Sequence, residues 1–219
     1  MKPETQILKE RLAETLNILL ELEFIKKDLK TLLNSTEKQR KDTSSESHFF
    51  YRLYRNYIRL FIIDIFKLIG DKEDYSIKKL LNFCVSNREK IKWHNTISLE
   101  KLKSLNNNLL ITSKKFEHIK GLRNKYYAHN DKNKKSFTYE LSLLELWEVL
   151  EELQNIFTEI NLKFNNDEWY FDIQYSSPQV IQNLSKFKQL QRIILAKNKE
   201  VNSSIKTKKL FSILMGNQN

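Results

Sequence analysis

Apolar residues recur every three or four positions along most of the chain, which is the spacing of one face of an α-helix. The first such stretch predicts a long helix over residues 4–33, with lysine and glutamate between its leucines. Residues 34–47 contain no apolar side chain and predict a loop. Residues 48–70 predict a second helix that ends near Gly70, because glycine commonly follows the last turn of a helix.

The middle of the chain predicts two more helices. Asp74 or Ser76 can cap the first of them, which we expect to extend to about Trp93. Ser98 can cap the second, whose apolar positions continue to His129. The polar stretch that follows His129 then ends this helix.

The second half of the chain continues the helical pattern. We expect the helix that starts at Ser98 to bend or break near Thr112 and Ser113, whose hydroxyls compete for backbone hydrogen bonds. Another helix starts at about residue 138, residues 165–177 predict a short extended segment or hairpin fragment, and residues 178–199 predict a final helix. The apolar seam of the helix from about residue 138, spaced by three and four, comprises Leu143, Leu146, Leu150, Leu153, Phe157 and Ile160.

Composition supports an all-α fold. The chain has 219 residues but only 3 glycines and 2 prolines, whereas folds with many strands need frequent turns built from these residues. Hydrophobic residues make up 40% of the sequence, which is enough for a packed core. We therefore expect a four- to five-helix up-and-down bundle over residues 1–164. Residues 165–219 would add the short extended segment and a basic C-terminal helical extension.

The net charge of +11 is concentrated at the C-terminal end. Residues 178–219 carry eight lysines and arginines against a single acidic residue, Glu200. Such a tail can bind nucleic acid by releasing the counterions of phosphates, but a solvated lysine-rich helix would show the same pattern. The candidate nucleic-acid contacts in this tail are Lys186, Lys188, Arg192, Lys197 and Lys199.

Several classes of protein are disfavoured by the sequence. Cys84 is the only cysteine, which rules out an internal disulfide and a cysteine-rich metal site and fits a reducing cytoplasm. No apolar run is long enough to span a membrane, and the N-terminus is not a signal peptide. The three glycines are scattered, so no phosphate-binding loop exists, and no metal-binding histidine motif is present. We expect neither a metal nor a cofactor.

One segment gathers most of the candidate chemistry, the string GLRNKYYAHND at residues 121–131. A neutral imidazole such as that of His129 can accept the proton of an RNA 2′-hydroxyl, since its ordinary pKa lies near 6.5. The guanidinium of Arg123 can hold a phosphate and stabilise the charge that develops on it. The 2′-oxygen would then attack phosphorus and leave a 2′,3′-cyclic phosphate. Supporting polar side chains in the segment are Asn124, Lys125, Tyr126, Tyr127 and Asp131.

A structural interpretation of the same residues stays open. His129 lies at the edge of an apolar stripe, where it could be a core histidine bonded to a carbonyl or to Asp64. Asp64 itself interrupts an apolar run, so it must face water or pair with a cation from another helix. On a regular helix Arg123 and His129 point about 120° apart and are separated by about 9 Å along the axis. Either the helix unwinds at Ala128–Asn130, or a two-fold dimer brings Arg123 of one chain to His129 of the other.

The arrangement from Arg123 to His129 resembles the R-x(4–6)-H motif of the HEPN superfamily. The fuller string LRNKYYAHND between long helices is similar to the abortive-infection AbiU-type HEPN group. The resemblance covers residues 4–162 and does not explain the tail. HEPN toxins paired with nucleotidyltransferase antitoxins often carry a tyrosine two residues after the histidine, where this chain has Asp131. The resemblance therefore does not extend to antitoxin modification at that position.

This resemblance implies a helical bundle, usually dimeric, with the motif at the end of the third core helix. Active members are metal-independent ribonucleases of toxin–antitoxin and phage-defence systems. Carried over, Arg123 and His129 would be catalytic, with Asn124 as the polar neighbour. RNA, a second copy of the chain and an antitoxin or other protein are the expected partners. The alternatives are a non-catalytic HEPN module that binds RNA or protein, and a helical structural protein whose tail packs on the bundle.

Overall fold

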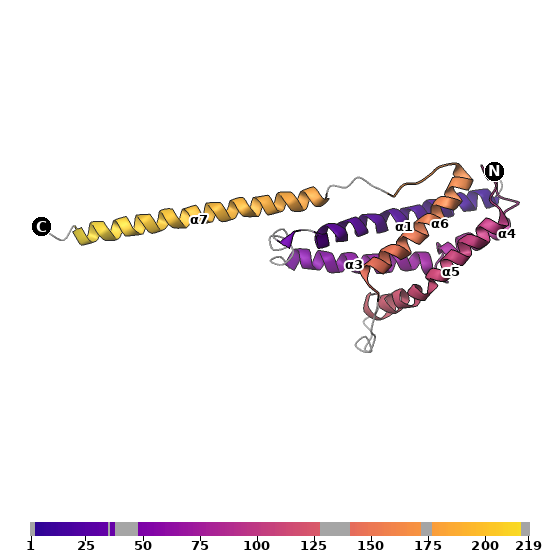
Figure 1. Cartoon of the computed structure of the whole chain (residues 1–219), viewed down its shortest axis with the longest axis horizontal. Helices are drawn as coiled ribbons and strands as arrows, with labels where there is room; N and C mark the ends of the chain where they lie inside the picture. Colours follow the sequence, from indigo (N-terminus) through magenta and orange to yellow (C-terminus); the bar gives the residue numbers. More distant parts are fainter. Residues whose placement is uncertain (1–2, 35, 38–47, 128–140, 172–176, 216–219) are drawn as a thin grey trace. The chain divides into compact units, whose positions relative to one another are not determined.

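The computed structural model of the chain describes residues 3–34, 36–37, 48–127, 141–171 and 177–215, with the backbone alone for residues 34, 126–127 and 205–215. Every regular element in these ranges is helical, as predicted, and no strand occurs among them (Figure 1). Residues 167–171, part of the expected extended segment, form no strand. The elements are α1 (Pro3–Asn34), α3 (His48–Ile69), α4 (Ile77–Asn87), α5 (Leu99–Leu122), a π-helical turn (Arg123–Tyr127), α6 (Leu143–Asn165) and α7 (Ser177–Met215).

The chain divides into two compact units. The first comprises residues 1–30 and 53–174, and the second comprises residues 31–52 and 175–219. In the first unit, apolar side chains from α1, α3, α4, α5 and α6 form one continuous core. The seam predicted for α6 faces this core, with Leu150, Leu153 and Ile160 fully buried. Burial of such leucine-sized side chains contributes roughly 1.5–3 kcal/mol each, so α6 is a principal source of the unit's stability.

Serine caps set where three helices begin. The hydroxyls of Ser76 and Ser98 accept backbone hydrogen bonds at the starts of α4 and α5, which confirms both predicted caps. The end of α4 was predicted wrongly, because the helix stops at Asn87 rather than near Trp93. The predicted start of the next long helix, at about residue 138, lies outside the described residues, and α6 itself begins later, at Leu143.

A reciprocal capping box explains the start of α6. The Ser142 hydroxyl accepts a hydrogen bond from the backbone of Glu145, and the Glu145 carboxylate accepts one of 2.8 Å from the Ser142 backbone. That backbone bond, with a second from the Ser142 hydroxyl, lowers the pKa of Glu145. The serine and the glutamate three residues later were visible in the sequence and should have located this boundary.

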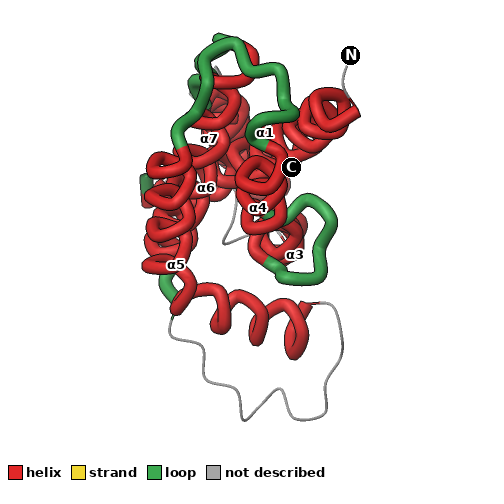
Figure 2. The backbone as a smooth tube through the Cα atoms, turned by 90° about the vertical axis from the view of Figure 1, so that its right-hand side faces the viewer, coloured by secondary structure: helices red, strands yellow, loops and turns green. Residues whose placement is uncertain are grey.

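Helix α5 is continuous but not straight (Figure 2). Its α-helical hydrogen bonding is unbroken to Leu122, so the predicted break is absent, but the helix changes direction along its length. The Thr112 hydroxyl donates to the Asn108 carbonyl at 3.2 Å, and the Ser113 hydroxyl donates to the Leu110 carbonyl at 2.6 Å. Side-chain bonds of this kind to the preceding turn bend helices. The bend turns the last part of α5 toward the end of α3.

Gly70 follows α3 as predicted, but for a different physical reason. Its backbone N–H donates to the Phe66 carbonyl at 2.8 Å, and its φ is not positive. A Cβ atom at this position would lie 2.7 Å from Cγ of Glu73 and 3.0 Å from the Phe66 carbonyl oxygen. Glycine is therefore required for space, because the turn after α3 folds tightly onto the helix end.

The single cysteine, Cys84, lies fully buried in α4, and this burial raises the pKa of its thiol to about 12. At pH 8 we expect alkylation by iodoacetamide to be at least ~100-fold slower in native protein than in urea-unfolded protein, because the thiolate is the reactive form. Because the folded-state pKa is raised, the stabilisation from the neutral thiol is complete below its ordinary pKa and is lost as pH rises toward 12. Mass spectrometry measures the rate, and equal rates in both states would contradict this burial.

None of the described helices is both long enough and apolar enough throughout to cross a bilayer.

Candidate functional site

Arg123 stands where α5 changes into the π-helical turn. Its backbone N–H donates to the carbonyls of both Ile119 and Lys120, four and three residues earlier, and the π-helical turn begins at this residue. Short π-helical segments are rare and are found frequently at functional sites. Tyr127 ends the turn. The separation of about 120° expected between Arg123 and His129 applies to a regular α-helix, which residues 123–127 do not form.

Two neighbours hold the Arg123 side chain in one orientation. Its Cζ atom lies 4.9 Å from the centroid of the Phe66 ring in α3, a cation–π contact. Its Nη1 atom donates a 2.9 Å hydrogen bond to Oδ1 of Asn124. The side chain is half-buried. Among the described residues, the guanidinium has no other hydrogen-bond or ion-pair partner, so its remaining N–H donors can bind a ligand.

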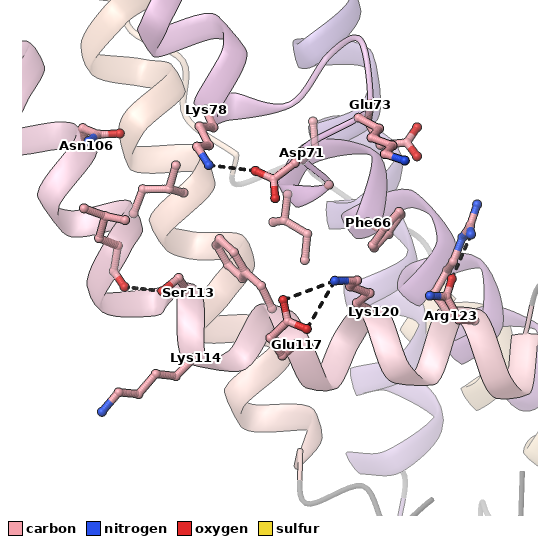
Figure 3. Close-up of a pocket in the computed structure, with 18 of the residues that line it drawn as sticks. Phe66, Asp71, Glu73, Lys78, Asn106, Ser113, Lys114, Glu117, Lys120 and Arg123 are labelled. Carbon is pink, nitrogen blue, oxygen red and sulfur yellow. Dashed lines mark hydrogen bonds and ion pairs between the residues drawn. The ribbon is translucent and has the colours of Figure 1, made fainter.

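A cleft of about 790 Å³ opens beside Arg123 (Figure 3). Its walls come from the end of α3, the turn that follows it, α4 and the bent part of α5. Five cationic and three anionic side chains line it, so the balance favours an anionic ligand. The charged lining residues are Lys72, Lys78, Lys114, Lys120, Arg123, Asp71, Glu73 and Glu117.

Ion pairs order part of this lining. Lys78 bonds to Asp71 at 2.8 Å, and Lys120 contacts Glu117 at 3.4 Å, as Figure 3 shows. The hydrogen bond from Lys78, and then its charge, lower the pKa of Asp71. Among the described residues, no ion pair holds the exposed Lys114 side chain, which extends away from the other labelled residues of the cleft (Figure 3). The ordered charges of the cleft are those of the Lys78–Asp71 and Lys120–Glu117 pairs.

The structure describes only some of the predicted site residues with their side chains. It brings Arg123 and Asn124 together and leaves Lys125 half-buried beside them. Tyr126 and Tyr127 are described only as backbone in the π-helical turn. The remaining predicted residues of the motif, His129 and Asp131, lie outside the described residues, as does the proposed unwinding at 128–130.

Asp64 pairs within its own helix. Its Oδ1 lies 2.6 Å from Nζ of Lys67, and its side chain is 18% exposed. Asp64 was expected to face water or to pair with a cation from another helix. It is instead largely buried and pairs with a lysine of its own helix, because the i,i+3 spacing on α3 already supplies one. Asp64 precedes Phe66 by two residues, so the two side chains point about 200° apart around α3. Its carboxylate therefore lies away from the ring that supports Arg123.

Sequence reasoning missed Phe66 and the lysines of the cleft. Phe66 is 57 positions from Arg123 in the chain, and nothing in the local pattern of α3 distinguishes it from other aromatic residues. Lys78 and Lys120 resemble any other surface lysine in the sequence. Only the packing of α3, α4 and the bent α5 shows that these side chains share one cleft.

The basic residues predicted to contact nucleic acid all lie in α7, in the second unit. Each of them is exposed, and Arg192 has an interaction partner. Among the described residues, no three histidine, cysteine, aspartate or glutamate side chains converge in a way that could hold a metal ion. The five basic residues are Lys186, Lys188, Arg192, Lys197 and Lys199.

An all-helical bundle whose R-x5-H string begins at a helix end, beside a basic cleft, defines a HEPN-type domain. Comparison with known protein families agrees: residues 6–182 match the family HEPN_AbiU2, described as AbiU2. The chain therefore belongs to the AbiU2 family of abortive-infection HEPN domains. No curated protein and no solved structure matches the chain. The family match extends past the expected residue 162 into the first turns of α7 and stops there.

Proposed function

We propose that the chain is a metal-independent endoribonuclease of a defence or toxin–antitoxin system, with Arg123 and His129 as its catalytic residues. His129 accepts the proton of a 2′-hydroxyl, and the 2′-oxygen attacks the adjacent phosphorus. Arg123 stabilises the negative charge that builds on the phosphoryl oxygens. The 5′-oxygen of the next nucleotide leaves, which yields a 2′,3′-cyclic phosphate and a 5′-hydroxyl end.

One observation supports this proposal most directly. Phe66 and Asn124 fix the orientation of the Arg123 guanidinium, which lies beside a cleft with more cationic than anionic side chains. A guanidinium that is already oriented loses little side-chain entropy when it binds phosphate. Its stacking on Phe66 leaves the N–H edges for hydrogen bonds to the phosphoryl oxygens. The cationic lysines of the cleft extend the attraction along an RNA strand.

The proposal includes a homodimer. A two-fold pairing of the motif helices would place Arg123 of one chain near His129 of the other, so each site takes one residue from each chain. RNA is the substrate, and an antitoxin or another protein partner would restrain the activity in the cell.

Cleavage of RNA in EDTA tests this function. Wild type is expected to produce cyclic-phosphate ends without added metal, whereas Arg123→Ala and His129→Ala are each expected to reduce the rate at least ~100-fold. Equal cleavage by all three proteins, or by none, would overturn the assignment.

A mixture of the two variants tests the composite site. In a dimer of one Arg123→Ala chain and one His129→Ala chain, one of the two sites regains both native residues. Random mixing should therefore restore about a quarter of wild-type activity if the sites are shared across the two-fold axis. No recovery after verified exchange of chains would mean that each site forms within one chain.

A non-catalytic binding module is the second candidate, and one observation favours it: part of the hydrogen-bonding capacity of Arg123 is already used on Asn124. This reading predicts RNA binding without cleavage, with an affinity that falls steeply as salt rises because the exposed lysines of α7 displace counterions. An RNA affinity that does not change with salt concentration would contradict a role for these lysines.

A further inference from the structure

Helix α7 carries many exposed apolar side chains. Every side chain from residue 190 to residue 204 is exposed, on all faces of the helix. The exposed fraction is 64% for Phe187, 58% for Ile194 and 55% for Val201. A single helix that is solvated on all sides is only marginally stable in water, so a partner for this stretch is expected.

Four apolar residues of α7 recur at a spacing of seven. Val180, Phe187, Ile194 and Val201 are spaced by seven, and they form one row of the helix. The residues four positions after each of them form a second row, which is apolar at its two ends and polar at its two middle positions. This is the a and d pattern of a two-stranded coiled coil, sustained over 26 residues or about 39 Å. The second row comprises Leu184, Gln191, Asn198 and Ile205.

We infer that α7 forms a parallel, in-register coiled coil with α7 of a second copy of this chain. Gln191 and Asn198 are the argument for a second copy, because each would lie in an otherwise apolar seam and needs a hydrogen-bond partner. In a parallel homodimer each amide faces its own counterpart, and an amide can both donate and accept. In an antiparallel pair the second row would face the first, whose members from residue 180 to residue 201 are all apolar, and both amides would be buried without partners.

The charges beside the seam agree with the same arrangement. In a parallel coiled coil, the residue just before each second-row residue lies beside the residue five positions later in the other copy. Lys188 then meets Asn183 of the second copy and Lys197 meets Asn202, so no lysine meets a lysine. Leu190 meets another leucine and adds apolar contact. The basic residues Lys186, Arg192 and Lys199 lie on the outer side of the helix, where RNA contact remains possible.

Cysteine cross-linking in the full-length protein tests this interface. The native Cys84 is fully buried, so an introduced cysteine is the only reactive thiol. Asn198→Cys is expected to form a disulfide-linked dimer under mild oxidation, because the two seam positions face each other. Ile193→Cys is the matched control: residue 193 is 54% exposed but lies on the outer side. Equal cross-linking of both variants, or none for Asn198→Cys, would overturn the inference.

A second substitution separates this interface from any dimer formed by the motif helix. In the Asn198→Cys background, Ile194→Asp is expected to slow cross-linking at least ~10-fold, since it places two carboxylates in the seam. Ile193→Asp, with the same change one residue earlier, should leave the rate unchanged. An unaffected rate with Ile194→Asp would refute a coiled coil at α7, whatever the outcome for RNA cleavage.

Discussion

Replacing Arg123 with lysine is expected to lower RNA cleavage about 100-fold, although the substitution keeps the positive charge. Lysine lacks the planar face that stacks on Phe66 and the second N–H edge that remains after one nitrogen has bonded to Asn124. The flexible lysine side chain would also have to become ordered each time the transition state forms, whereas the Arg123 side chain is already held in place. The loss should appear mainly in kcat, because the cleft lysines that attract RNA are unchanged.

Lys103→Gln is the control for this variant. It also changes a cation on α5, but Lys103 is exposed and does not line the cleft. Its cleavage rate should stay within about twofold of wild type, and thermal melting should show that both variants are folded. Wild-type activity in Arg123→Lys would contradict the view that the orientation of the guanidinium, rather than its charge alone, serves catalysis.

Replacing Lys26 with methionine is expected to reduce the free energy of unfolding by about 3 kcal/mol. In the core of the first unit, the Glu23 carboxylate receives 3.0 Å and 3.1 Å contacts from Lys26 Nζ and Gln154 Nε2. The side chain of Glu23 is only 6% exposed and that of Lys26 14%. Methionine retains most of the apolar packing of lysine but leaves a buried carboxylate without its counter-charge. Urea denaturation followed by circular dichroism measures the effect.

The double variant Glu23→Gln with Lys26→Met separates charge from packing. It removes both charges and keeps a side-chain oxygen that accepts the hydrogen bond from Gln154. Its stability is expected to lie within about 1 kcal/mol of wild type, because a buried ion pair contributes little net free energy once both charges are removed together. A double variant as unstable as Lys26→Met alone would show that lost packing, not the unpaired charge, causes the destabilisation.

Local signals in the sequence determined most of the helices. The seam from Leu146 to Ile160 identified the buried face of α6, because its period is that of a helix and its side chains must leave water. Ser76 and Ser98 located two helix starts, since a capping hydroxyl acts on backbone atoms a few residues away. The same kind of signal exists at Ser142, whose capping box with Glu145 starts α6 at Leu143 rather than near residue 138.

The sequence also singled out Arg123 and the motif that carries the family membership, because that motif is a short string. Only the tertiary structure decided what supports Arg123: the ring of Phe66, far away in the chain, and a cleft assembled from α3, α4 and the bent end of α5. Such contacts depend on how helices pack against one another. Helical periodicity records which face of each helix is buried but not which residue of another helix lies against it.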